Sequence, residues 1–495
     1  MKRAAGIFLH PTSLPCRFGT GDFGETAYTW IEMLAEAKQT YWQVCPLGPT
    51  GYGDSPYQCL SSYAGNPLLI SPQLLYESHL ISPEDLEAYP RFPDRFVDYG
   101  PVITAKQQLF RKAFERFEID DRFLAFCRRQ QHWLDDYALF RVLKSINGDK
   151  AWSHWPREQR LRDPDTLQRL RKQHDSQFRF HQFLQYCFFQ QWSGIREHAE
   201  KNNIRIIGDL PYYVAYDSAD AWACPDAFEL DEEGRPLRVA GVPPDYFSET
   251  GQLWGNPLYR WDWIAAGGYR WWQERIAATY KLVDVIRLDH FRGFEAYWAV
   301  PADSDTAVNG EWIKGPDIDF FLQMHKRFGE LQIIAEDLGE ITPDVEALRK
   351  EIGFPGMAVL QFAFDGKADN PYLPYNVSKD SVMYTGTHDN NTSLGWFRGL
   401  NREEKVRVCK YLGCEPEKFV EFFLRHAYGS PSDLCMIPLQ DVLGLDKKHR
   451  MNIPGTGAGN WQWRCPPELF TRRSLSMISE FADIYGRAAH WGRRT

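Results

Sequence analysis

Several features that would narrow the function at once are missing from this chain of 495 residues. No apolar run is long enough to span a bilayer, so we expect no membrane partner. Nothing after Met1 resembles a signal peptide, because Pro11 and Pro15 soon interrupt the first apolar run. We therefore expect a cytoplasmic protein. No long basic run occurs either, and the net charge is −9, so nucleic acid is not an expected partner.

The cysteines show no metal-binding pattern. There are ten of them, and Cys45, Cys187 and Cys435 lie inside apolar segments, which is typical of buried free thiols rather than of a disulfide framework. Cys409 and Cys414 form the closest pair, but no second pair or histidine cluster accompanies them. The sequence therefore predicts no metal site.

One motif suggests a cofactor but lacks the right context. Residues 19–24 match G-x-G-x-x-G before a helical pattern. In a dinucleotide-binding fold the strand runs directly into that turn, whereas here residues 10–18, with two prolines, lie between them. We therefore expect no dinucleotide and no other cofactor.

Short apolar runs recur along the chain, as expected for strands buried on both faces of a parallel sheet. Helical patterns lie between several of them, including 25–38, which carries Ala27, Trp30, Ile31 and Leu34 on one face. This alternation predicts an α/β fold, a (β/α)8 or TIM barrel. The eight runs are 5–9, 41–47, 205–210, 283–288, 332–335, 357–364, 382–386 and 434–439.

The spacing of these runs is uneven, which predicts two large insertions. Residues 71–204, after the second strand, look mainly helical, with a long helix expected over 180–202. Residues 211–282, after the third strand, are dense in Pro, Gly, Asp, Tyr and Trp, a loop composition with some helix near 269–280. No Gly/Ser linker divides the chain, so we expect residues 1–495 to form one catalytic body.

The fourth run ends with an arginine and an aspartate that a strand would place on the same face, Arg287 and Asp289. A cation beside a carboxylate lowers its pKa and keeps it ionised. An ionised carboxylate at a strand tip is what attack on a sugar carbon requires. Taken alone, the pair fits a structural ion pair equally well.

Other strand ends also carry acids. Asp209 lies near the end of the third run, and Glu336 and Asp389 follow the fifth and seventh runs. The carboxyl ends of barrel strands share the face where such enzymes hold their active sites. Gathering carboxylates there is unfavourable without a purpose, so we interpret them as a catalytic site.

Two carboxylates with separated pKa values can run glycoside chemistry. We expect Asp289 to be the nucleophile and Glu336 the general acid and then base. Asp389, with His388, would hydrogen-bond sugar hydroxyls and stabilise positive charge at the anomeric carbon. Asp337 is the alternative to Glu336, but strand alternation points it the other way.

The order of these residues along the chain resembles the α-amylase superfamily. Residues 241–259, GVPPDYFSETGQLWGNPLY, are more specific, because they resemble the signature loop of the amylomaltases, the 4-α-glucanotransferases. Segments 51–57, 65–67, 387–392 and 450–456 fit the same family, so the resemblance spans nearly the whole chain.

This resemblance implies a retaining transglycosylase that acts on α-1,4-glucans and maltooligosaccharides, with glucose as an acceptor and no metal. It implies the roles already given for Asp289, Glu336 and Asp389. It also implies that a set of residues binds substrate, with Trp254 on the acceptor side: Ser55, Tyr57, Asp209, Arg287, His388 and Trp254.

The signature loop carries two aromatic residues, Tyr246 and Phe247, in a segment bounded by prolines and glycines. A mobile loop with aromatic faces would cover the covalent intermediate and exclude water, which favours transfer over hydrolysis. The alternative is a rigid loop with packed rings.

Two further tyrosines, Tyr52 and Tyr99, are candidates for an outer glucan-binding platform, although lone tyrosines more often serve packing. Two other functions remain open at this point. They are an amylase-like glucan hydrolase and a non-catalytic glucan-binding barrel, which the complete set of carboxylates disfavours.

Overall fold

The structure is a computed structural model that describes residues 2–244 and 248–488. Eight parallel strands form its central sheet in the order β10-β11-β12-β1-β2-β3-β6-β9. The two ends of this order meet where the Ala335 N–H donates to the Pro355 carbonyl, at 2.9 Å. The strands are β1 (Ala4–Phe8), β2 (Tyr41–Gln43), β3 (Arg205–Leu210), β6 (Val285–Leu288), β9 (Ile333–Ala335), β10 (Gly356–Val359), β11 (Ser381–Tyr384) and β12 (Leu434–Pro438). Each overlaps one of the eight predicted runs, so the predicted (β/α)8 barrel is confirmed.

The inside of the barrel is filled by side chains from every strand. One buried cluster contains Tyr41, Ile207, Val285, Ile334 and Tyr384, among others. Their neighbours along the strands belong instead to the larger core under the helices, as the alternation of a strand requires. In a strand, the residue two positions after an inward-facing residue also points inward. Residues at the carboxyl ends of the strands that continue this alternation therefore face the inside of the barrel.

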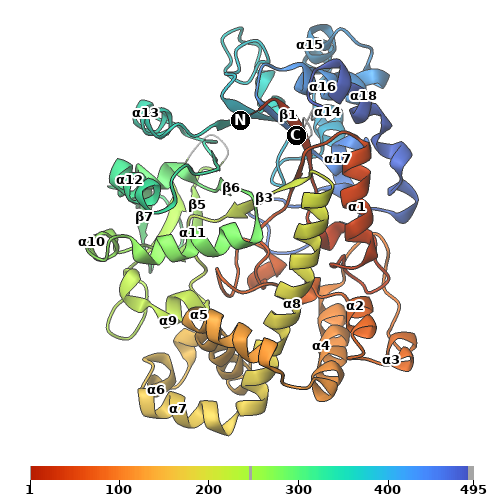
Figure 1. The fold of residues 1–495 in the computed structure, drawn as a ribbon. Helices are drawn as coiled ribbons and strands as arrows, with labels where there is room; N and C mark the ends of the chain where they lie inside the picture. Colours follow the sequence, from red (N-terminus) through yellow and green to blue (C-terminus); the bar gives the residue numbers. More distant parts are fainter. Residues whose placement is uncertain (1, 245–247, 489–495) are drawn as a thin grey trace.

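Helices pack around the barrel between the strands (Figure 1). The predicted amphipathic helix is present as α1 (Glu25–Glu36), with Ala27, Trp30, Ile31 and Leu34 all buried. Helix α13 shows why local sequence fixes an element. Its N-cap Thr342 accepts the Val345 N–H, Pro343 opens the helix, and Gly353 ends it in the left-handed conformation. The other helices between barrel strands include α11 (Arg270–Leu282), α12 (Asp317–Phe328), α14 (Ser393–Gly399), α15 (Arg402–Leu412) and α16 (Phe419–Gly429), and α18 (Ser476–Ile484) follows the last strand.

The chain between β2 and β3 is helical over most of its length. Its longest helices, α5 and α8, pack against each other and lie at the side of the molecule away from α14 to α16 (Figure 1). We propose that residues 71–204 form one inserted subdomain. Its helices are α2 (Pro72–Glu77), α3 (Pro83–Glu87), α4 (Tyr99–Arg116), α5 (Asp121–Ile146), α6 (Arg157–Arg160), α7 (Pro164–Gln173) and α8 (Asp175–Lys201).

The second insertion contains more regular structure than its loop-like composition predicts. Strands β4 (Arg238–Val242) and β5 (Gln252–Pro257) pair with β7 (Ala296–Pro301) and β8 (Glu311–Lys314) in a four-stranded antiparallel sheet, in the order β5-β4-β7-β8. These strands escape sequence reasoning because three of the four contain Gly or Pro, and because an irregular register interrupts the β4–β5 pairing. Val242 of β4 pairs with Gln252 of β5 in this sheet.

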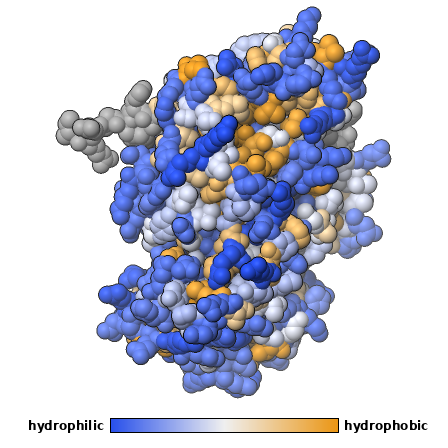
Figure 2. Space-filling model, turned by 90° about the vertical axis from the view of Figure 1, so that its right-hand side faces the viewer, coloured by the Kyte–Doolittle hydropathy of each residue, from blue (hydrophilic) through white to orange (hydrophobic). Residues whose placement is uncertain are grey.

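The surface is mixed in character. Figure 2 shows hydrophilic residues over much of one face, with hydrophobic residues gathered mainly toward its upper half. Within residues 2–244 and 248–488, none of the helices combines the length and the apolar character needed to cross a lipid bilayer.

Candidate active site

A buried arginine links the acids of two neighbouring strands. Asp209 and Arg287 are directly opposed in the β3–β6 register. The Arg287 Nη1 donates to Asp209 Oδ2 at 2.7 Å and to Asp289 Oδ1 at 2.8 Å. The side chains of Arg287 and Asp209 are only 5% and 2% exposed, whereas that of Asp289 is 26% exposed. Asp289 is therefore the member of this group that substrate can reach, and its Oδ2 bonds to no residue that the structure describes.

Glu336 is held beside Asp289 by backbone donors. His290, directly after Asp289, has a left-handed backbone with φ 49°, an unfavourable conformation for a residue with a side chain. This turn lets the His290 N–H donate to Glu336 Oε2 at 2.7 Å, while the Leu338 N–H donates to Oε1 at 3.0 Å. The backbone turn at His290 therefore links the Glu336 carboxylate to the segment that carries Asp289.

Burial raises the pKa of two acids in this cluster, Glu336 and Asp209. The pKa of Glu336 is raised to about 7, mainly by burial and also by the charge of Asp289, against the opposing effects of Arg287 and the two backbone N–H groups. Burial also raises the pKa of Asp209 to about 6, with Arg287 opposing it. A carboxyl group that still holds a proton near neutral pH suits general acid catalysis.

Asp337 points away from this cluster, as strand alternation predicts. Its carboxylate lies 3.0 Å from the Arg349 Nε and accepts the Met357 N–H at 2.7 Å. These contacts join β9 to helix α13 and strand β10, so they leave Glu336 as the acid on the site side.

Asp389 reaches the site from the loop after β11. Asn452 Nδ2 donates to Asp389 Oδ1 at 2.6 Å, and the Arg450 guanidinium donates to the Asp389 carbonyl at 2.8 Å. The Asp389 side chain is 47% exposed, and partial desolvation acts to raise its pKa, but the charge of His388 and hydrogen bonds from His388 and Asn452 together hold that pKa below its usual value. Asp389 is therefore ionised.

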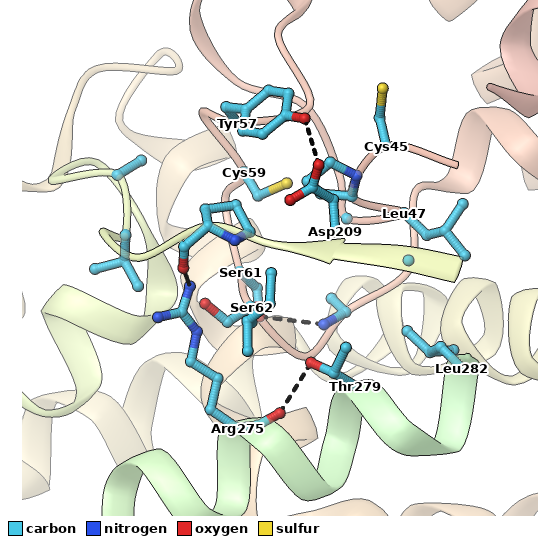
Figure 3. Close-up of a pocket in the computed structure, with 18 of the residues that line it drawn as sticks. Cys45, Leu47, Tyr57, Cys59, Ser61, Ser62, Asp209, Arg275, Thr279 and Leu282 are labelled. Carbon is cyan, nitrogen blue, oxygen red and sulfur yellow. Dashed lines mark hydrogen bonds between the residues drawn. The ribbon is translucent and has the colours of Figure 1, made fainter. Parts of the chain in front are cut away.

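Tyr57 joins the two sides of the site. Its hydroxyl donates to Asp209 Oδ2 at 2.7 Å, and its ring stacks on His388 with the centroids 4.9 Å apart. Ser55 Oγ accepts the Tyr57 N–H at 3.2 Å, so Ser55 supports the turn that carries this tyrosine. A cavity of about 60 Å³ lies beside Tyr57 and Asp209, with Arg275 and Thr279 of α11 on its other side (Figure 3).

The remaining predicted contacts are spread more widely. The Trp254 ring, on β5, packs edge-on against His290 with the centroids 4.9 Å apart. Tyr246 and Phe247 lie outside the described residues. Tyr52 is 81% exposed, as a platform residue must be, but Tyr99 is only 6% exposed and donates to the Trp461 carbonyl at 2.8 Å. The prediction that Tyr99 helps to form an outer glucan site is therefore wrong, because its ring offers no free face.

Sequence reasoning missed the roles of Asn452 and Arg450. Both lie in segment 450–456, which was recognised as a family motif but was given no contact. The only available signal was the motif itself, because no spacing rule places it against Asp389. Among the residues that the structure describes, no group of three or more His, Cys, Asp or Glu side chains is arranged to hold a metal ion.

An eight-stranded α/β barrel that gathers several carboxyl groups at one end, one of them with a raised pKa, is typical of enzymes that act on glycosidic bonds. A family model described as 4-alpha-glucanotransferase matches residues 9–470. The chain belongs to this 4-α-glucanotransferase family.

Similar proteins agree with this assignment. A 4-alpha-glucanotransferase of Synechocystis sp. is 47% identical over 98% of both chains, and one of Thermus thermophilus is 48% identical over 94% of this chain and 95% of its own. The structure of an amylomaltase from Streptococcus agalactiae in complex with acarbose has a TM-score of 0.96 and 37% identity, and covers 99% of this chain and 100% of that one. An amylomaltase from Corynebacterium glutamicum has a TM-score of 0.78 at 18% identity, covering 97% of this chain and 75% of that one, which shows the shared fold alone.

Proposed function

We propose that this protein transfers segments of α-1,4-glucan between maltooligosaccharides, with retention of configuration and with glucose among its acceptors. The observation that carries this proposal is the contrast between neighbouring carboxyl groups. Asp289 is ion-paired with Arg287, while burial raises the pKa of Glu336 to about 7. One group is therefore suited to attack and the other to proton transfer.

In the first step, Asp289 Oδ2 attacks the anomeric carbon of the donor sugar. Glu336 gives its proton to the glycosidic oxygen as the bond between that oxygen and the anomeric carbon breaks. The released chain leaves with a free 4-hydroxyl, and the donor segment stays on Asp289 as an ester. In the second step, Glu336 takes the proton from an acceptor 4-hydroxyl, whose oxygen displaces Asp289.

The surrounding residues have separate roles in this scheme. Arg287 and Asp209 position Asp289, while Tyr57 and His388 form a stacked pair at the donor sugar. Asp389, held by Asn452, stabilises the positive charge that develops at the anomeric carbon. Trp254, beside His290, would line the acceptor side.

The product pattern from maltotriose tests transfer directly. We expect glucose together with maltooligosaccharides longer than maltotriose, separated by chromatography. Glucose and maltose without longer products would favour the amylase-like hydrolase. Alanine at Tyr246 and at Phe247 should increase the share of hydrolysis if this loop excludes water from the intermediate.

We also infer that the protein works in the cytoplasm. All ten cysteines are free thiols, although Cys409 and Cys414 lie close together, which fits a reducing compartment. Cell fractionation checks this inference, because transferase activity should follow a cytoplasmic marker enzyme.

A further inference from the structure

A second cavity lies between the helical insertion and the loop that follows β2. Its volume is about 120 Å³, which is room for about four water molecules at ~30 Å³ each. Helices α4, α5 and α8 line one side, and residues 49–50, Leu60 and 66–68 line the other. None of the catalytic carboxylates borders it.

The walls of this cavity combine an apolar surface with a few polar groups. Leu60, Phe110 and Leu184 are among the buried apolar side chains that line it. Most of the polar groups come from the helices, and this mixture is typical of small-molecule sites. The helices supply Lys106, Gln107, Tyr137, Arg141 and His181, and the loop adds Thr50 and Asn66.

One positive charge at this cavity, that of the partly exposed Arg141, has no protein partner among the described residues. The Lys106 ammonium is satisfied, because it donates to the Leu68 and Ile70 carbonyls at 2.7 and 3.0 Å and lies 3.7 Å from Asp22. Arg141 differs, since within the described part of the chain it has no hydrogen bond or ion pair, and no carboxylate is among the described residues of the lining. Burial lowers the pKa of His181 well below its usual value, and the charges of Arg141 and Arg111 lower it further. The charged groups that shift the pKa of His181 in the described structure are therefore both cations.

We propose that this cavity is a binding site for a small anion that carries an apolar group, such as a short carboxylate or a phosphate monoester. The planar guanidinium of Arg141 presents paired N–H donors that match a carboxylate or a phosphate. Gln107, Tyr137 and neutral His181 add N–H and O–H donors around the same anion. The aliphatic and aromatic wall takes the apolar part of the ligand.

The site shares a wall with the loop that carries Tyr57. Thr50 and Cys59 form a β-bridge, and the Leu60 N–H donates to the Pro49 carbonyl at 2.8 Å. Pro49, Thr50 and Leu60 all border the cavity. A bound anion would therefore contact the base of the hairpin from which Tyr57 reaches Asp209.

Isothermal titration of the full-length protein at constant ionic strength tests the charge requirement. The probes are butyrate, inorganic phosphate and butyramide, a neutral molecule with nearly the shape of butyrate. We expect butyrate or phosphate to bind at least about tenfold more tightly than butyramide. If butyrate binds more tightly than phosphate, the site prefers a carboxylate; if phosphate binds more tightly, it prefers a phosphate. The proposal is overturned if neither butyrate nor phosphate binds more tightly than butyramide.

The variant Arg141→Gln tests whether the anion binds in this cavity. Because Arg141 has no partner in the described structure, the variant should keep the melting temperature of the parent while losing about tenfold or more in anion affinity. Arg129→Gln, an exposed position on the same helix, should bind as the parent does. Unchanged anion binding by Arg141→Gln, or displacement of butyrate by maltotriose, would show that the cavity is not an anion site.

Discussion

The two halves of the active site are held by different means. Asp209 and Arg287 come from adjacent strands in register, and their side chains are 2% and 5% exposed. Asp389 comes from a loop, its side chain is 47% exposed, and it depends on Asn452, 63 residues further along the chain. The strand-borne half is therefore fixed by the barrel itself, whereas the loop-borne half is fixed by individual hydrogen bonds. Substitutions in the two halves should differ in size and in kind.

Asp289→Asn should have the largest effect on activity, because the amide oxygen cannot form the covalent intermediate. We expect kcat for maltotriose to fall by about 10⁴-fold or more. The melting temperature should change little, since the amide is the same size and stays in place. Near-normal turnover by a pure preparation would show that another group attacks the sugar.

Arg287→Lys tests whether the strand-borne half needs the guanidinium and not only its charge. A single ammonium cannot reproduce the geometry by which Arg287 bonds to both Asp209 and Asp289. A displacement of the nucleophile by about 1 Å is expected to lower kcat by roughly 10²-fold. Steady-state kinetics measures this, with Arg129→Lys as the exposed control. A loss no larger than that of the control would mean that Arg287 does not position Asp289.

Asn452→Ala tests the loop-borne half. The variant loses one hydrogen bond to an ionised carboxylate, worth about 1.5 kcal/mol or about tenfold in kcat. The exposed setting predicts little change in the free energy of unfolding, in contrast to the buried arginine. Asn202→Ala, which removes a helix-terminal hydrogen bond far from the site, is the control. Strong destabilisation by Asn452→Ala would contradict the contrast between the halves.

The remaining effect concerns stability and pH rather than turnover. The pKa of Glu336 is about 7, above its usual value of 4.5, so between these two values the folded protein binds more protons than the unfolded chain. The contribution of Glu336 to the free energy of unfolding therefore falls as pH rises through this window. Glu336→Gln should remove that decline, so the variant should gain stability relative to the parent from pH 4.5 to pH 8 in urea titrations. A parallel pH dependence of the two proteins would contradict the raised pKa, and Glu340→Gln is the exposed control.

The barrel was predictable because its strands are buried on both faces and read as continuous apolar runs. The same reasoning identified the candidate catalytic acids, because a carboxylate at the end of such a run must lie at one face of the barrel. The antiparallel sheet was not predictable in this way. Strand β8 has the sequence EWIK, in which only Ile313 is half-buried and the other three residues are exposed, so it lacks the apolar run that marks the barrel strands.

Contacts between distant loops could not be inferred from spacing. The bond from Asn452 to Asp389 depends on how two segments close over the barrel, which no local pattern encodes. Tyr52 and Tyr99 illustrate a related difficulty, because composition does not separate an exposed ring from a buried one. Helix α4 begins at Tyr99 and buries that ring, whereas Tyr52 lies in an exposed turn.

The central claim is that Asp289 is the nucleophile and that Glu336 moves the proton. The most direct measurement is mass spectrometry of peptides from the Glu336→Gln variant after incubation with α-maltotriosyl fluoride, whose fluoride leaves without a proton from the enzyme. Because the variant lacks the base for the second step, a covalent maltotriosyl adduct should accumulate on the peptide that contains Asp289. No adduct, or an adduct on Asp209 or Asp389, would contradict the account.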